Sequence, residues 1–400
     1  MTPTRKPIYM DYNATTPVDP TVLEAMLPFL KDRFGNPSSG HLFGKEAKEE
    51  LEKARERVAS LISAEPEEVV FTSGGTESDN QAIMGTALRK GGHVITSTIE
   101  HPAVLETCRY LEREFGQRVT YLPVDRYGFV NPRYVEEAIT KDTCLISIMH
   151  ANNEVGTLEP LEEIGRIAAE HDVAFHTDAA QSCGKVVVDV DRLGVDLLTM
   201  AGHKLYAPKG VGALYVRRGF KVDGLLHGAG QENGRRAGTE NVPYIVGLGV
   251  ACDLARKSQR RFERRVRDLR DGLYRNISEG LGASRVMLNG HPTKRLPNTL
   301  NISIVGVVGE DLLRHMPELA ASTGSACHSG SVEPSPVLLA MGIRRELARG
   351  ALRLSLGRWT SKEEAQRASE MIVNAAARVR AGGTGRIPNE GLRLPEAGPR

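Results

Sequence analysis

Short apolar runs rich in β-branched residues alternate with longer amphipathic segments along the first 220 residues. Such alternation predicts strands joined by helical crossovers, and therefore a mostly parallel sheet with helices on its faces. The predicted strands are residues 68–73, 93–98, 118–124, 144–150, 173–179, 196–201 and 212–218. We expect an α/β fold with a three-layer, mainly parallel sheet domain.

The pattern changes near residue 254. Residues 254–280 form a strongly charged helical run in which acidic side chains interleave with basic ones, which favours a solvated helix face over an RNA-binding stripe. Beyond it, strands at 299–307 and 351–358 and a helix at 361–381 predict a smaller α+β domain. The expected organisation is an N-terminal segment near the small domain (1–14), a large domain (15–255), the small domain (256–380) and a disordered Gly- and Pro-rich tail (381–400).

Charge and cysteine content narrow the possible functions. The chain has 400 residues, with 52 basic and 50 acidic side chains, so its overall field does not attract nucleic acid or anionic membrane. No stretch approaches the ~20 apolar residues of a membrane span, and the N-terminus lacks a signal-peptide core. We therefore expect a cytoplasmic protein. Five scattered cysteines without a C-x-x-C pair argue against a disulfide framework and a metal site.

Two residues at strand ends suggest the chemistry. Lys204 follows the predicted strand 196–201, and Asp178 lies at the end of the predicted strand 173–179. Ligands of open α/β sheets gather at the carboxyl ends of strands. A lysine amine that condenses with an aldehyde and a carboxylate that keeps a pyridine nitrogen protonated are what a pyridoxal phosphate enzyme requires. Taken alone, a lysine after a strand is more often a solvated surface charge, and an aspartate at a strand end is more often a helix cap or turn residue.

A phosphate site is predicted where a strand, a Gly-Gly turn and a helix start follow one another in EVVFTSGGTESDN. Glycines allow close backbone approach, and free amides at a helix N-terminus suit a dianionic phosphate. Helix capping by Ser73 or Thr76 is the alternative explanation.

Further polar residues lie at strand ends. His101 is placed to stack on the cofactor ring and move protons, and His203 to reach the phosphate. Gln181 is placed to contact the phenolic oxygen of the cofactor, and Asn153 lies at yet another strand end.

At this point the chain resembles a known family, the cysteine desulfurases, in the class V aminotransferase branch of fold-type I pyridoxal phosphate enzymes. The matching segments follow the family order from residue 10 to about 360, so that only the tail lies outside them. They are MDYNATTPVDP, GNPSSGHLFG, TSGGTESDN, EHPAVLE, HANNEVGT, HTDAAQ, GHKLYAPKG, QENGRRAGTENVP, STGSACHSGSVEPS and RLSLGR.

The resemblance implies a role for each site residue. Lys204 would bond to the cofactor aldehyde, and Asp178 would pair with the pyridine nitrogen. Asn153 and Arg353 would orient the carboxylate of L-cysteine, and Thr239 would reach the phosphate of the neighbouring subunit of a homodimer. The remaining cofactor contacts would be Gly75, Thr76 and His203 to the phosphate, Gln181 to the phenolic oxygen and His101 on the ring.

Two positions refine this expectation. Ala201 stands where many family members carry a serine, and the missing hydroxyl predicts weaker cofactor binding. Cys327, in ASTGSACHSGSVEPS, matches the family's sulfur carrier, which would attack the substrate sulfur and hold it as a persulfide. Among the other cysteines, Cys144 and Cys252 are expected in the core, whereas Cys108 and Cys183 are not assigned.

Alternative functions remain open at this stage. A class V aminotransferase or a selenocysteine lyase would share Lys204 and Asp178 without needing Cys327, and a non-catalytic scaffold would use the charged helix for docking. The residues also leave open where the sulfur goes. An acceptor protein would take it for iron–sulfur cluster assembly, tRNA thiolation or DNA phosphorothioation, with no direct binding of nucleic acid or membrane.

Overall fold

The computed structural model describes residues 6–324, 327–328 and 331–381, without the side chains of residues 327, 328, 331 and 332. The predicted tail beyond Ala381 lies outside the described residues, and so does the side chain of Cys327.

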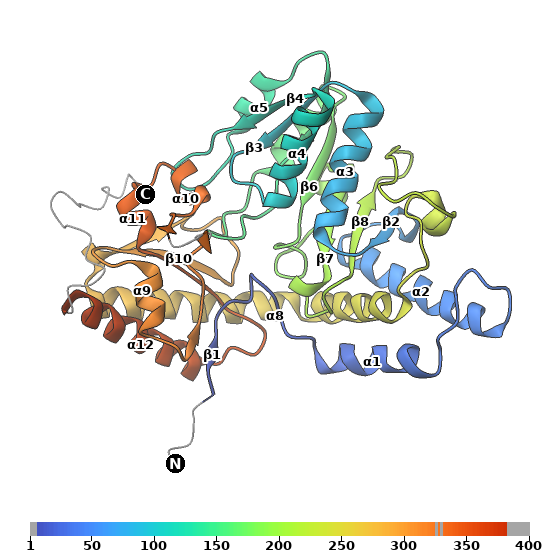
Figure 1. The fold of residues 1–400 in the computed structure, drawn as a ribbon. Helices are drawn as coiled ribbons and strands as arrows, with labels where there is room; N and C mark the ends of the chain where they lie inside the picture. Colours follow the sequence, from blue (N-terminus) through green and yellow to red (C-terminus); the bar gives the residue numbers. More distant parts are fainter. Residues whose placement is uncertain (1–5, 325–326, 329–330, 382–400) are drawn as a thin grey trace.

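A seven-stranded sheet forms the large layer of the molecule (Figure 1). The strand order is β2-β8-β7-β6-β5-β3-β4; β8 runs antiparallel to both neighbours and the other pairs are parallel. The mainly parallel sheet that the apolar pattern predicted is thus confirmed. The strands are β2 (Val69–Thr72), β3 (His93–Ser97), β4 (Arg118–Leu122), β5 (Thr143–Ser147), β6 (Ala174–Asp178), β7 (Leu197–Ala201) and β8 (Gly212–Val216).

Helices cover both faces of this sheet. On one face, Ile83 of α3 and Val104 of α4 share an apolar cluster with the strands. On the other face, Val58 of α2 and Ile164 of α6 belong to the main core. The helices of this part are α1 (Pro20–Lys31), α2 (Leu42–Leu61), α3 (Gly75–Lys90), α4 (Pro102–Phe115), α5 (Pro132–Ala138), α6 (Leu161–Glu170) and α7 (Val190–Leu193).

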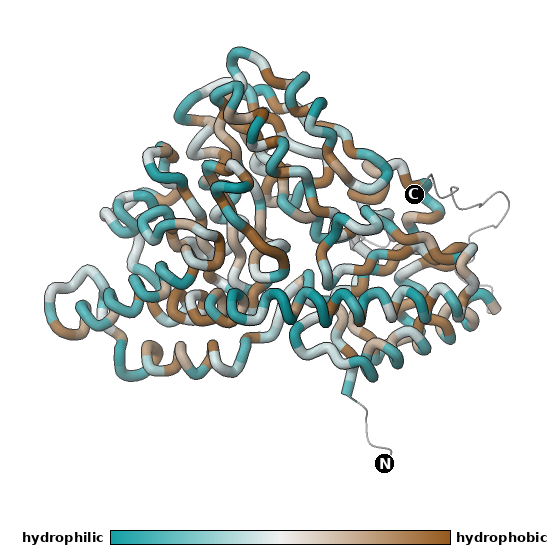
Figure 2. Tube along the Cα trace, turned by 180° about the vertical axis from the view of Figure 1, so that it is seen from behind, coloured by the Kyte–Doolittle hydropathy of each residue, from teal (hydrophilic) through white to brown (hydrophobic). Residues whose placement is uncertain are grey.

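One long helix, α8 (Val242–Leu281), joins the two cores. It begins earlier than the predicted helix 254–280, because the apolar residues before Leu254 pack against the sheet core. Its second half supplies Val266, Leu273 and Ile277 to a separate core. Figure 2 shows α8 running along the base of the molecule past both parts, with a hydrophilic stretch in between.

The second core belongs to a small antiparallel sheet in the order β14-β10-β9, covered by α8 and α12. Strands β10 and β14 were predicted, whereas the short strand β9 was not. The N-terminal strand β1 pairs with β11, and its Ile8 lies in this core. The elements are β1 (Ile8–Tyr9), β9 (Val286–Asn289), β10 (Thr299–Ile304), α9 (Gly309–Arg314), β11 (Leu319–Ala320), β12 (Cys327–His328), β13 (Ser331–Val332), α10 (Pro336–Ala340), α11 (Arg345–Arg349), β14 (Ala351–Ser355) and α12 (Lys362–Ala381).

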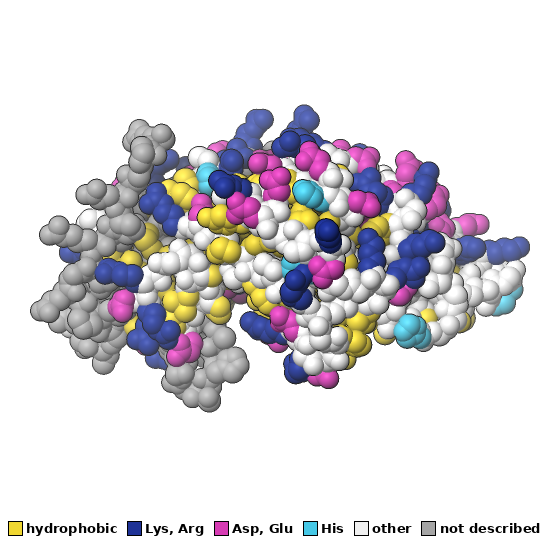
Figure 3. Space-filling model, turned by 90° about the horizontal axis from the view of Figure 1, so that it is seen from above, with side chains coloured by type: hydrophobic (Ala, Val, Ile, Leu, Met, Phe, Trp, Pro, Cys, Tyr) yellow, Lys and Arg dark blue, Asp and Glu magenta, His cyan; other side chains and the backbone are white. Residues whose placement is uncertain are grey.

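The surface carries charges of both signs. In the view from above, Lys and Arg side chains interleave with Asp and Glu (Figure 3). None of the helices in the described part of the chain combines the length and the apolar character that crossing a bilayer requires.

Candidate active site

Lys204 and Asp178 lie at the same edge of the large sheet. Asp178 ends β6, and Lys204 follows the neighbouring strand β7 in a short turn. The Lys204 Nζ donates hydrogen bonds of 2.7 Å to the backbone oxygens of Asn13 and Ala14. The N-terminal segment therefore holds the amine in place.

Lys204 and Asp178 each shift the pKa of the other. Burial lowers the pKa of Lys204 to about 8, helped by Arg353 and opposed by Asp178. Burial also raises the pKa of Asp178, while the backbone N–H of Ala180, His101 and Lys204 pull it down. Because Lys204, Asp178 and His101 act on one another through space, the predicted amine and acid face a common site.

His101 caps helix α4. Its Nδ1 accepts a 3.1 Å hydrogen bond from the backbone N–H of Ala103, which places the proton of the neutral ring on Nε2. Burial lowers the pKa of His101, and Lys204 lowers it further against the opposing effect of Asp178. The ring lines a cavity of about 390 Å³ together with Thr76. A neutral imidazole here suits both stacking and proton transfer.

The N-terminus of α3 is open to an anion. Its N-cap is Gly74 and makes no side-chain capping hydrogen bond, so the alternative of a cap by Ser73 or Thr76 is wrong. Instead, the backbone N–H of Ser73 donates to Glu77, whose carboxylate is also held by Arg236. The first amides of α3 are therefore available to a phosphate.

Two neighbours complete this cradle. A Cβ built on Gly75 would lie 3.3 Å from the Cβ of Ala201, so the side chain of Ala201 points at the start of α3. His203 contacts Thr15 through Nδ1 at 3.2 Å, and burial lowers its pKa to about 4, which keeps the ring neutral.

Thr239 lies elsewhere in the chain's own fold. It is exposed and lines a separate cavity of about 160 Å³ with Ser73 and Arg236.

Arg353, on β14, is oriented toward the site by two contacts. Its Nη2 donates to Asp11 at 2.8 Å, and its Nη1 donates to the backbone oxygen of Asn153 at 3.2 Å. Its Nε is buried and has no hydrogen-bond partner among the described residues. Asn153 takes part through its backbone oxygen only, and no hydrogen bond within the described part of the chain engages its side chain.

Asn13 is a site residue that the sequence reasoning missed. Its backbone oxygen accepts from Lys204 and, at 2.9 Å, from Gln181 Nε2. Its side chain donates to the backbone oxygen of Asn153 at 3.1 Å and to Thr299 at 2.8 Å. The motif MDYNATTPVDP contains Asn13, but no local pattern distinguishes it there.

Lys185 was missed as well, because a lysine after a turn is normally a surface charge. It is only 5% exposed, and burial lowers its pKa to about 7. Its Nζ donates to the Gln181 oxygen at 2.7 Å. With that oxygen engaged and one N–H donating to Asn13, Gln181 keeps its second N–H for the phenolic oxygen of a cofactor.

Buried acids lie behind Asp178. Burial raises the pKa of Asp79 well above its ordinary value, and the nearby Asp178 raises it further. Glu100 has its pKa raised by burial to about 8, although Ser97 donates to its carboxylate at 2.6 Å. With a pKa near 8, Glu100 is largely protonated at neutral pH and adds little repulsion to Asp178.

Four cysteines are buried, and Cys108 and Cys183, left unassigned above, join Cys144 and Cys252 in the interior. Burial raises the pKa of the Cys108 thiol to about 12 and raises that of the Cys183 thiol further. These thiols are therefore poor nucleophiles.

The described residues on both sides of Cys327 meet at Glu154. Ser335 donates a short hydrogen bond to the Glu154 carboxylate, and a Cβ built on Gly324 would lie 2.5 Å from the same carboxylate. Only glycine fits at position 324, where φ is +71°. Glu154, next to Asn153, thus ties the ends of the Cys327 segment to the site.

The donor set fits pyridoxal phosphate and does not suggest a metal. An amine with a lowered pKa, an acid opposite, a neutral imidazole and an uncapped helix start are the groups that this cofactor needs. No cluster of potential metal ligands occurs in the described ranges.

Comparison with known proteins identifies close relatives. The family model for class-V aminotransferases matches residues 8–368. A cysteine desulfurase IscS from Dictyoglomus turgidum is 52% identical over 90% of this chain and 92% of its own length. A solved NifS-like protein has a TM-score of 0.87 at 37% identity, covering 93% of this chain and 100% of that one. A structure described as SspA in complex with cysteine has a TM-score of 0.77 at 41% identity, over 88% and 100% of the two chains.

The lowered pKa of Lys204 predicts a pH profile. Apo-protein mixed with pyridoxal phosphate should form the coloured adduct at a rate that rises with pH and levels off above about pH 8, where the amine is neutral. Stopped-flow absorbance measures this rate. A midpoint near 10.5, the ordinary lysine value, would contradict the assigned environment. The unfolded chain holds this proton more tightly, so Lys204 also favours folding increasingly between about pH 8 and 10.5.

The placement of Ala201 predicts a gain of cofactor affinity. Ala201→Ser should add a hydroxyl that faces the start of α3, and a hydrogen bond to a charged group is worth about 1.5–3 kcal/mol. Fluorescence titration of the apo-protein should then give a dissociation constant at least ~10-fold lower than that of the parent. An unchanged constant for Ala201→Ser would show that position 201 does not reach the phosphate.

Proposed function

Because the chain belongs to the class-V aminotransferase family and, within it, to the cysteine desulfurases, we propose that it takes the sulfur of L-cysteine onto Cys327. The products are L-alanine and a persulfide, which an acceptor protein then discharges. The convergence of Lys204, Asp178 and His101 on one site, with Arg353 beside the amine, carries this proposal.

Pyridoxal phosphate is the cofactor of this proposal, in keeping with the pyridoxal-phosphate dependence of the family. When bound, it withdraws electrons from the substrate Cα. Lys204 would carry it, Asp178 would face its pyridine nitrogen and Gln181, oriented by Lys185, its phenolic oxygen. The phosphate would lie on the first turn of α3, near Gly75, Thr76 and His203.

Arg353 and Asn153 would hold the substrate carboxylate. Arg353 keeps its Nε free of hydrogen bonds to the described residues, and Asp11 fixes its orientation. A guanidinium paired with a carboxylate in a buried place sets both position and direction of the substrate. The amino group of the substrate would then lie toward Lys204.

Lys204 and His101 would move the protons. An amine with a pKa of about 8 can take the Cα proton once the substrate has displaced it, and can return a proton later. His101, neutral and carrying its proton on Nε2, would serve as the second carrier.

Cys327 would take the sulfur. Its thiolate attacks the substrate sulfur, a new S–S bond forms, and the Cβ–S bonding pair stays with the carbon fragment, which is protonated and leaves as alanine. The four remaining cysteines are buried with thiol pKa values raised by burial, so none of them competes for this role. The final use of the sulfur stays open among iron–sulfur assembly, tRNA thiolation and DNA phosphorothioation.

A homodimer is part of the proposal. Helix α1 exposes Leu23, Leu27 and Leu30, at helical spacing, and the stacked pair Phe34 and Phe43 extends this apolar α1 face. On its buried side, Phe29 of α1 packs against Val242 and Val246 of α8, which joins α1 to the segment that follows exposed Thr239. A second copy seated there would cover the apolar side chains and bring Thr239 near its active site.

The sulfur-carrier role predicts a split phenotype. Cys327→Ser should keep the visible absorbance of the bound cofactor and lose sulfide release from L-cysteine, whereas Lys204→Ala should lose the absorbance. Cys108→Ser, a buried thiol, serves as the matched control and should retain sulfide release. Undiminished sulfide production by Cys327→Ser would disprove the role. Alanine formed from cysteine by the parent protein separates a desulfurase from an ordinary aminotransferase.

The proposed subunit contact on the α1 face predicts that a charge placed there lowers the mass of the protein in solution. Leu27→Glu should place a charge in the subunit contact and convert a dimer into a monomer in analytical ultracentrifugation. Leu88→Glu, at a comparably exposed leucine on α3, should leave the mass unchanged. An unaltered dimer in the Leu27→Glu variant would exclude the α1 face as the interface.

A further inference from the structure

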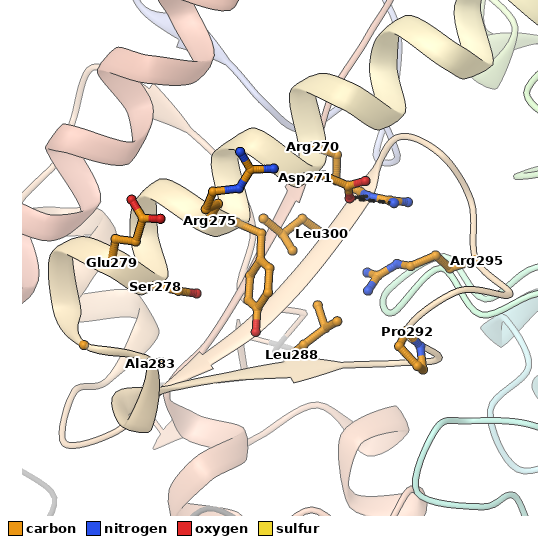
Figure 4. A pocket seen from close by; sticks show the side chains of 12 residues that line it. Arg270, Asp271, Arg275, Ser278, Glu279, Ala283, Leu288, Pro292, Arg295 and Leu300 are labelled. Carbon is orange, nitrogen blue, oxygen red and sulfur yellow. Dashed lines mark hydrogen bonds and ion pairs between the residues drawn. The ribbon is translucent and has the colours of Figure 1, made fainter. Parts of the chain in front are cut away.

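A further cavity lies in the small-sheet part of the molecule, away from Lys204. It measures about 650 Å³ and opens between the C-terminal half of α8 and strands β9 and β10 (Figure 4). None of the active-site residues named above lines it.

The notable group in this cavity is Arg295. The residue is only 6% exposed, and Figure 4 shows its guanidinium pointing into the cavity. Its Nη2 donates to the backbone oxygens of Thr299 at 2.8 Å and Val155 at 3.3 Å. Its Nε is buried without a partner, and no carboxylate in the described part of the chain forms an ion pair with it. A buried guanidinium without a counter-ion favours an anion.

The nearby charges do not supply that anion. Asp271 is engaged by Arg270 at 2.7 Å, and Arg270 also donates to the backbone oxygen of Leu296 at 2.8 Å. Burial, and to a smaller extent the proximity of Arg270, lower the pKa of Arg295 to about 9, whereas Asp271 opposes this shift. Glu279 lies on the exposed rim.

The rest of the cavity is amphipathic. Leu288 and Leu300 form apolar walls, and Ser278, at the end away from Arg295, has a buried hydroxyl without a partner in the described residues. Arg275 is exposed at the same helix. An occupant therefore needs a negative head for Arg295, an apolar body and room for a polar group at the far end.

We propose that this cavity is a binding site for a small organic carboxylate. The carboxylate would accept from the Arg295 guanidinium, whose bonds to Thr299 and Val155 both use Nη2, and the apolar body would lie between Leu288 and Leu300. Such a ligand would contact Arg295, which donates a hydrogen bond to the backbone oxygen of Val155, two positions from Asn153. The backbone bonds Leu296 N–H to Gly156 and Leu158 N–H to Lys294 connect the same two segments. The inference does not depend on the proposed function.

Benzoate and its neutral isostere benzamide test the site by calorimetric titration of the cofactor-loaded protein. Benzoate should bind at least about tenfold more tightly than benzamide, because only the charged head pairs with Arg295. Arg295→Lys should weaken benzoate binding about tenfold, because lysine lacks the planar guanidinium that pairs with a carboxylate. Arg264→Gln, an exposed arginine of α8 outside the cavity, should bind like the parent.

Two variants keep the test decisive if Arg295→Lys misfolds. Leu288→Trp should fill the cavity and abolish benzoate binding without altering the bonds of Arg295 to Thr299 and Val155. Arg353→Lys should retain benzoate binding, because Arg353 belongs to the active site and does not line this cavity. Equal affinity for benzoate and benzamide would overturn the proposal. So would binding that survives Leu288→Trp but is lost in Arg353→Lys, since the carboxylate would then occupy the active site.

Discussion

The removal of the Lys204 amine from water is the constraint on which the rest of the site depends. An exposed lysine is protonated near neutral pH and cannot act as a nucleophile or a base. Burial at the sheet edge, with Arg353 nearby, brings its pKa to about 8. Asp178 opposes this change, so the site balances an amine that must lose its proton against an acid that must keep its charge. Because Glu100 is largely protonated at neutral pH, it adds little negative charge near Asp178 and does little to raise the pKa of Asp178 further.

The segment that holds the Lys204 amine lies far from Lys204 in the sequence. Asn13, between β1 and α1, contacts the Lys204 amine and Gln181 with its backbone oxygen, and its side chain also reaches Asn153 and Thr299 of β10. Since β1 pairs with β11 of the small-sheet part, the position of the amine is tied to the mutual arrangement of the two parts.

Helix α8 and the Glu154 contacts define how the smaller part meets the site. Because α8 contributes side chains to both cores, the packing along this one helix sets how the two cores are placed relative to one another. Arg353 enters the site from β14, and Glu154 meets the residues on both sides of Cys327. Arg353 and Ser335, which lies after Cys327, thus contact the neighbouring residues Asn153 and Glu154.

The sequence by itself determined the α/β class, the strands of the sheet and most of the polar groups at its edge. These follow from local information: strands are encoded in runs of apolar residues, and parallel strands bring their carboxyl ends to one edge. Lys204, Asp178 and His101 could therefore be grouped before any coordinates were known, and the family motifs extended the set to Arg353. The tertiary structure alone decided that Asn13 and Lys185 join the site, that α3 starts without a side-chain cap, that α8 spans both cores and that Arg295 is buried without a counter-ion. Each of these depends on burial and on contacts between residues distant in the chain, and a residue's own neighbours in sequence do not encode them.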